Sequence, residues 1–382
     1  MALVTPPDGL PPLVDHHCHG VIRHHPEADE FAGYLTESDR PPAPGTSYLD
    51  TQAGFAVRRW CPPALGLPPH CPPADYLARR AELGPDEARR RLLTAAGIGA
   101  YLVDTGLPGP LTGPAETAAS GDGTGHEVVR LENLAERAAQ QAADAEEFTH
   151  TLARFVRDAA AHAVAFKTVA AYRHGLALQA RPPGPDAVHA AARAWLAAEA
   201  GRHTPGPARL TDPVLLRHLL ELAVATGLPL QIHTGFGDPD LRLHHADPSL
   251  LTDFVRATAD TGTPLVLLHC YPYHRQAAYL AAVYPHVYAD VGLTLGHTGA
   301  HAAAVLAEFL ELTPFGKLLF STDAYGLPEL YTVGSAVFRS ALRTVLDGWT
   351  HTGAWSYEDA ARIAALIAAG NARRVYGLGE GS

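Results

Sequence analysis

Lysine is almost absent from this chain of 382 residues, occurring only at positions 167 and 317. Arginine fills nearly all the other basic positions. Because arginine does not lose its proton in a protein, a retained lysine is a candidate for chemistry that needs a neutral amine. Lys167, inside the apolar segment AVAFKTV, is such a candidate, whereas we expect Lys317 to be a chance survivor.

The chain also lacks an apolar run of 18 residues and a long basic run, and its net charge is −11. The first absence argues against a membrane-spanning helix. The acidic balance argues against nucleic acid or an anionic membrane surface as a partner. The N-terminal MALVTPPDGLPP is too rich in proline for the apolar core of a signal peptide. We therefore expect a cytoplasmic globular protein that acts on a small molecule, with a homo-oligomer as an open alternative.

Cysteine is scarce as well, at positions 18, 61, 71 and 270 only. The segment CPPALGLPPHCPP places Cys61, His70 and Cys71 near one another, but the spacing fits neither a zinc knuckle nor a disulfide framework. We expect a loop stiffened by proline that carries buried thiols.

Eight short apolar or β-branched segments alternate with helical patterns rich in alanine and leucine. The expected strands span residues 13–19, 99–106, 127–133, 163–172, 228–235, 264–270, 286–292 and 317–324. Such alternation is typical of parallel strands with both sheet faces covered. Eight units predict an α/β fold of the (β/α)8 TIM-like barrel type. A doubly wound open sheet is the structural alternative.

One connection is much longer than a crossover helix requires. Residues 20–97, between the first two strands, contain helical patterns joined by proline-rich loops. We expect a helical insertion at the barrel mouth, within a single domain that spans residues 1–382.

The first strand, LVDHHCH, is unusually rich in histidine. Side chains two positions apart share a face of a strand. This spacing predicts that Asp15, His17 and His19 point into the barrel, with Asp15 one layer deeper to orient the other two. It also predicts that His16 and Cys18 face the helices as packing residues.

Later strands also end in ionisable groups. His233, His269 and Asp323 end their strands, and Lys167 lies within the fourth. Alone, each histidine could be a hydrogen-bonded core residue, and Asp323 could cap a helix. Because the carboxyl ends of barrel strands meet at one mouth, we expect these groups to converge with the histidines of the first strand. Imidazoles with a carboxylate predict a site for zinc, manganese or iron.

Four residues after the strands are candidates for substrate binding. Tyr172 and Arg173 follow the fourth strand and Arg275 follows the sixth. A guanidinium pairs with a carboxylate through two hydrogen bonds, which suits an acidic substrate, although a surface ion pair is the alternative for each arginine. Glu132, at the expected end of the third strand, could contact a substrate amine or cap the next helix.

The segments DHHCH, FKT, IHTGFGD, LLHCYP, STDA and GNARRVYGL resemble the amidohydrolase superfamily. More narrowly, they resemble its amidohydrolase-related branch, which includes decarboxylases and lactonases. The longer segments FKTVAAYRHGL, HTGFGDPDLRL and LLHCYPYHRQAAYLA are similar to nodulin-type amidohydrolase domains, some of which are fused to a glutamine-synthetase-like domain. The resemblance spans nearly the whole chain.

This resemblance implies a divalent metal centre, with zinc first and manganese or iron as alternatives. The implied ligands are His17, His19, Asp323, His233 and often His269. In relatives with two ions, a carbamylated lysine at the position of Lys167 bridges them. A plain ammonium that binds a substrate carboxylate is the other interpretation of Lys167, and one or two ions are therefore both open.

The resemblance also implies an enzyme. The leading hypothesis is hydrolysis of an amide C–N bond by metal-activated water, with Asp323 moving the proton and His269, if not a ligand, polarising the carbonyl. A γ-glutamyl amide is the favoured substrate by analogy. Non-oxidative decarboxylation is the alternative reaction, and a non-catalytic binding module, which predicts lost ligands, ranks last.

Overall fold

The structure, a computed structural model, describes residues 9–201 and 209–379, so the first eight residues of the proline-rich N-terminal segment lie outside the described part. Eight strands form one sheet in which each strand runs parallel to the next along the chain. The strands are β1 Leu13–Cys18, β2 Ile98–Asp104, β3 Thr124–Arg130, β4 Ala165–Thr168, β5 Leu230–Thr234, β6 Leu265–His269, β7 Val287–Asp290 and β8 Leu318–Leu319.

The sheet closes on itself between its first and last strands. The Asp323 amide donates to the His17 carbonyl at 3.0 Å, and the His19 amide donates to the Ala324 carbonyl at 2.8 Å. Regular strand geometry in β8 covers only two residues, fewer than expected, but the chain beyond it continues alongside β1. The prediction of a (β/α)8 barrel is confirmed.

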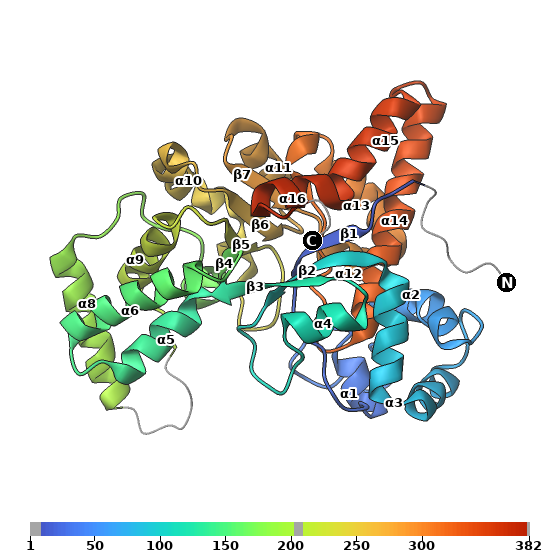
Figure 1. Cartoon of the computed structure of the whole chain (residues 1–382), viewed down its shortest axis with the longest axis horizontal. Coiled ribbons are helices and arrows are strands. Elements are labelled where there is room, and N and C mark those ends of the chain that lie inside the picture. Colours follow the sequence, from blue (N-terminus) through green and yellow to red (C-terminus); the bar gives the residue numbers. More distant parts are fainter. Residues whose placement is uncertain (1–8, 202–208, 380–382) are drawn as a thin grey trace.

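Helices surround the barrel (Figure 1). Their bounds are α1 Ala28–Gly33, α2 Gln52–Trp60, α3 Pro73–Ala96, α4 Pro114–Ser120, α5 Leu131–Gln141, α6 Ala145–Ala160, α7 Ala170–Arg173, α8 Pro185–Ala200, α9 Pro213–Val224, α10 Thr252–Thr258, α11 His274–Val283, α12 Thr294–Thr298, α13 Ala302–Phe309, α14 Pro328–His351, α15 Tyr357–Ala365 and α16 Asn371–Tyr376.

Two strands end earlier than the sequence pattern indicates. β3 ends at Arg130 and β4 at Thr168, instead of at residues 133 and 172. Glu132 therefore lies in the first turn of α5. Its Oε1 accepts hydrogen bonds from Thr168 Oγ1 at 2.6 Å and from the Val169 amide at 3.0 Å. This buried carboxylate takes the first amide after β4 and so ends the strand there.

Apolar side chains fill the barrel below its mouth. One cluster of buried residues combines strand residues with residues of α16: Val14, Ala100, Leu102, Val128, Ala165, Val266, Leu268, Leu319, Ala372, Val375 and Tyr376. Because strand side chains alternate between faces, apolar residues at the intervening positions, such as Tyr101 and Phe166, pack outward against the helices. Figure 1 shows α16 beside β1, where it plugs the barrel.

The segment between β1 and β2 is helical, with α1, α2 and α3, and α2 and α3 pack against α14 (Figure 1). A buried ion pair joins α3 to α14, because Arg80 Nε donates to Glu329 Oε1 at 2.7 Å. The Tyr76 hydroxyl donates to the same oxygen at 2.8 Å. The insertion is thus attached to the barrel by a desolvated polar contact as well as by apolar packing.

The expected orientation of the β1 side chains is wrong for Asp15 and His16, because the strand contains a β-bulge. Asp15 pairs with Tyr101, and Cys18 pairs with Val103. Between these two pairs β1 advances by three residues and β2 by two, so β1 contains one extra residue. The extra residue brings both His16 and His17 to the inner face. Asp15 is turned away from the barrel interior and accepts hydrogen bonds from the backbone and side chain of Thr322.

All four cysteines are buried free thiols, as expected for Cys61 and Cys71. Within the described residues, no helix combines the length and apolarity that a membrane crossing needs.

Replacing Arg80 with methionine should strongly destabilise the protein. The change leaves the buried Glu329 carboxylate without its cation, and breaking a buried pair in this way costs about 3–5 kcal/mol. Urea unfolding of the R80M variant measures the loss. Arg90→Met removes an exposed pair with Glu87 and serves as the control with nearly unchanged stability. Equal midpoints for the two variants would contradict this role of Arg80.

Candidate metal centre and active site

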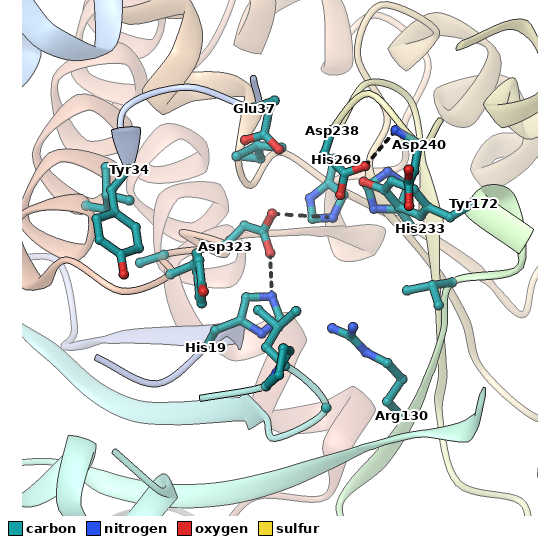
Figure 2. A pocket seen from close by; sticks show the side chains of 18 of the residues that line it. His19, Tyr34, Glu37, Arg130, Tyr172, His233, Asp238, Asp240, His269 and Asp323 are labelled. Atoms are coloured by element: carbon teal, nitrogen blue, oxygen red, sulfur yellow. Dashed lines mark hydrogen bonds and ion pairs between the residues drawn. The ribbon is translucent and has the colours of Figure 1, made fainter. Parts of the chain in front are cut away.

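A cavity of about 1160 Å³ opens at the carboxyl ends of the strands. Its floor includes His19, Lys167, His233, His269 and Asp323, and the loop after α1, with residues 34–39, forms part of its wall. Figure 2 shows Asp323 facing His19 and His269 across this floor. The predicted convergence of residues from distant strands is therefore present in the fold.

Hydrogen bonds fix the tautomers of His17, in β1, and of His19, directly after it. Gln231 Nε2 donates to the His16 carbonyl at 2.7 Å, so Oε1 of the same amide faces His17 Nδ1 at 2.8 Å. His17 must therefore carry its proton on Nδ1. His19 Nδ1 likewise donates to the Asp104 carbonyl at 3.1 Å. In their neutral forms both rings present an Nε2 lone pair to the cavity.

These lone pairs meet the Asp323 carboxylate. His17 Nε2 lies 3.1 Å and His19 Nε2 3.3 Å from Asp323 Oδ1, to which none of the residues that the structure describes donates a hydrogen bond. His269 Nε2 lies 3.6 Å from Oδ2. Electron pairs that face one another at such distances repel unless a cation lies between them. The donor set, three imidazoles and one carboxylate, therefore fits a divalent metal ion.

The electrostatics of the floor favour the ligand forms of these groups. Burial, with a contribution from Lys167, lowers the pKa of His17 to about 4. Burial also lowers the pKa values of His233 and His269 well below 6.5. Burial raises the pKa of Asp323, but the positive charge that the surrounding imidazoles carry when protonated lowers it by more, to well below 3.8, so the carboxylate is ionised. Neutral imidazole and ionised carboxylate are the forms that bind metals.

Lys167 lies beside the same centre. It is buried, and its Nζ is 3.0 Å from His17 Nε2. Burial lowers the pKa of this amine to about 8. An amine with such a pKa exchanges readily between ammonium and neutral forms near neutral pH, so both interpretations from the sequence are chemically accessible.

His269 reaches the site through an unusual backbone conformation. The alternation in β6 sends Leu268 inward and would send the next side chain outward. His269 and Cys270 instead have φ values of 65° and 67°, in the left-handed region that non-glycine residues rarely adopt. The ring centroid of His269 lies 4.7 Å from that of His233, whose buried Nε2 has no hydrogen-bond partner.

Sequence reasoning missed three ionisable strand ends. Asp104 ends β2, Arg130 ends β3 and Asp290 ends β7. Arg130 Nη2 donates to Asp104 Oδ2 at 2.6 Å and also lines the cavity. Figure 2 shows Arg130 pointing into the open space opposite Asp323. The signal was available, because YLVD and VYAD end in aspartate in the same way that LLFSTD does.

The four predicted substrate contacts divide into two pairs. Tyr172 and Arg173, on α7, line the cavity. Arg275 does not line it, since this exposed side chain pairs with Glu311 at 2.8 Å. Glu132 is fully buried beneath the cavity, where it braces the end of β4. The geometry thus retains Tyr172 and Arg173 as candidates and places Arg275 and Glu132 in structural roles.

A barrel whose mouth gathers histidines and aspartate around one point is typical of metal-dependent enzymes that act on small molecules. A family model described as amidohydrolase matches residues 114–378. The chain therefore belongs to the amidohydrolase family, as its motifs predicted.

Individual relatives agree with this assignment. One similar structure is that of a protein from Lactobacillus casei ATCC 334, described as a metal-dependent hydrolase. The two are 28% identical with a TM-score of 0.84, and the match covers 97% of this chain and 96% of the other. A uronate isomerase from Bacillus halodurans C-125 has a TM-score of 0.65 but 14% identity, a likeness of fold alone. Protein fluG of Emericella nidulans is 35% identical over 248 residues. The chain spans only 28% of the length of fluG, and the narrower nodulin-type resemblance stays a prediction.

Replacing Asp323 with asparagine should weaken metal binding. Asparagine keeps the shape but removes the negative charge that two Nε2 lone pairs face. We expect the affinity for Zn²⁺ to fall more than about 100-fold, beyond the loss typical of residues that only orient ligands. Competition of the loaded protein with a chromogenic chelator measures this. Asp240→Asn, at the exposed rim, is the control that should bind as the unchanged protein does, and tight binding by D323N would remove Asp323 from the ligand set.

Proposed function

We propose that this protein is a metal-dependent hydrolase that cleaves the C–N amide bond of a small substrate bearing a carboxylate, such as a γ-glutamyl amide. The observation that carries the proposal is the approach of two imidazole nitrogens to the Asp323 carboxylate at the floor of a large cavity. Family membership and the metal-dependent hydrolase from Lactobacillus casei support it.

His17, His19, His269 and Asp323 would hold a divalent ion, which would lower the pKa of a water molecule from about 15.7 toward about 7 and polarise a carbonyl. Asp323 accepts the proton that this water loses as its oxygen bonds to the amide carbon. The same carboxyl group then returns the proton to the leaving nitrogen as the C–N bond breaks. The products are a carboxylic acid and an amine.

Charged side chains divide the cavity wall into two regions. Arg130 and Arg173 line one side, and each is already paired with one acid, Asp104 and Glu136 respectively. A guanidinium has five N–H donors, so both retain donors for a substrate carboxylate. Burial lowers the pKa of Arg173, which the approach of an anion would restore. We assign the substrate carboxylate to this side.

Carboxylates form the other region. Figure 2 shows Glu37 and Asp238 on the same side of the cavity, apart from Arg130. Burial raises the pKa of Asp238, and the nearby charges of Asp240 and Glu37 add to this shift. In the part of the chain that the structure describes, no arginine or lysine forms an ion pair with Asp238 or Glu37. An ammonium group of the substrate would relieve their repulsion, and a γ-glutamyl amide carries both an ammonium and a carboxylate.

A product assay with the metal-loaded protein tests the reaction. The panel contains γ-glutamyl anilide, glutaryl anilide without the ammonium group, and dihydroxybenzoic acids. We expect amine release, fastest from the γ-glutamyl compound, and D323N should reduce kcat by about 10²–10⁴-fold. Carbon dioxide released from the aromatic acids, without amine from the anilides, would replace this proposal with the decarboxylase.

Metal analysis of the same protein addresses Lys167. Close to one equivalent of metal assigns Lys167 as an ammonium, and two equivalents assign it as a carbamate bridge. Zinc is the expected ion, with manganese and iron as alternatives.

Replacing Arg173 with leucine should raise KM more than it lowers kcat. The change removes a charge-assisted hydrogen bond to the substrate carboxylate, so KM for the γ-glutamyl amide should rise about tenfold or more. Steady-state kinetics measure the two constants separately. Arg275→Leu, outside the cavity, is the matched control with unchanged kinetics, and an R173L variant with the KM of the unchanged protein would overturn the assignment.

A further inference from the structure

A chain of buried polar groups lies directly beneath the metal centre, within the otherwise apolar interior of the barrel. Its members are Gln231 on β5, Tyr376 on α16, His16 on β1 and Asp290 on β7. The side chains of all four residues are buried. Buried polar groups in an apolar interior are costly unless hydrogen bonds satisfy them, so their mutual geometry decides what they do.

The hydrogen bonds of this group run in one consistent direction. Gln231 Nε2 donates to the Tyr376 hydroxyl oxygen at 2.9 Å. The same hydroxyl donates to His16 Nδ1 at 3.0 Å, which leaves the proton of the neutral ring on Nε2. His16 Nε2 lies 3.1 Å from Asp290 Oδ1, a close polar contact without hydrogen-bond geometry. The Tyr376 hydroxyl therefore accepts from Gln231 and donates to His16.

Each end of the chain reaches a proposed metal ligand. Gln231 Oε1 accepts the Nδ1 proton of His17, which leaves the His17 Nε2 lone pair for the metal. Asp290 Oδ2 accepts a hydrogen bond from the His269 amide at 3.2 Å, at the residue whose φ of 65° turns its ring into the site. His17 is therefore held by a hydrogen-bonded path that begins on the last helix.

We propose that Tyr376 is a positioning residue for the metal centre, acting through Gln231 on His17. This inference rests on the metal centre of the proposed function. Without the hydroxyl, one Gln231 N–H and His16 Nδ1 both lose their partner inside the barrel. The Gln231 amide is then less firmly held in the orientation that presents Oε1 to His17.

Other properties of Tyr376 agree with this role. Burial raises the pKa of its phenol, so the hydroxyl keeps the proton that it donates. Its ring packs in the apolar cluster with Val14 and Leu319 and stacks at 5.7 Å on the His16 ring. The ring thus anchors α16, and the hydroxyl alone enters the polar network. A phenylalanine in its place would separate these two contributions.

The test compares Tyr376→Phe with Tyr101→Phe in the full-length, metal-loaded protein. Tyr101 is an equally buried tyrosine whose hydroxyl has no hydrogen-bond partner, so its variant controls for loss of a buried oxygen. Each protein is titrated with a chelator while protein-bound Zn²⁺ is measured, and the absorption spectrum of the Co²⁺-loaded form reports the ligand geometry. Gln231→Met, which removes the acceptor of His17 directly, is the third variant.

We expect the affinity for Zn²⁺ to fall about tenfold in Y376F and about 100-fold in Q231M, the range found for residues that orient metal ligands. Y101F should match the unchanged protein, and the Co²⁺ spectrum should change in Y376F but not in Y101F. Equal affinity and spectrum in Y376F and Y101F would overturn the role of Tyr376. Failure of the unchanged protein to bind Zn²⁺ or Co²⁺ would instead overturn the metal centre. If Y376F does not fold, Q231M with unchanged metal affinity overturns the network.

Discussion

The approach of the His17 and His19 lone pairs to Asp323 is the constraint on which the rest of this site depends. Nothing in an apolar barrel favours two imidazole nitrogens within 3.3 Å of one carboxylate oxygen, so each group must be held there by other contacts. Hydrogen bonds from Nδ1 fix both rings, and a backbone bond from Asp323 to the His17 carbonyl fixes the carboxylate. The fold therefore holds mutually repelling groups together at the barrel mouth, and a bound cation would remove this repulsion. This is the usual physical basis of a preformed metal site.

Above this centre, the cavity separates charge as a substrate with two charged groups would require. Arg130 and Arg173 are partly neutralised by acids that also orient them, so they offer donors in fixed positions. Glu37 comes from the insertion and Asp238 from the loop after β5, so the barrel and its insertion both contribute to the cavity wall. In the proposed function, these wall residues decide the choice of substrate. Fold alone does not fix that choice.

Much of this arrangement could be predicted from the sequence, because a barrel brings its strand ends together whatever the details of the loops. That rule was sufficient for the positions of His233, His269 and Asp323. It was insufficient for the orientation of β1, since a bulge changes which side chains face inward without altering the residue pattern. It also failed for Arg275, because the rotation of a helix about its axis decides whether a residue after a strand faces the mouth or the solvent. The positions of Glu37 and Asp238 could not be predicted from the sequence, because they depend on the conformation of long loops over the barrel.

The contact between His16 and Tyr376 joins residues 360 positions apart in the chain. A ribosome therefore synthesises the histidines of β1 long before α16. Were Tyr376 to position His17 as proposed, a nascent chain would bind a metal ion weakly until α16 had docked into the barrel. The order of synthesis would then delay formation of a reactive site until the barrel around it is closed.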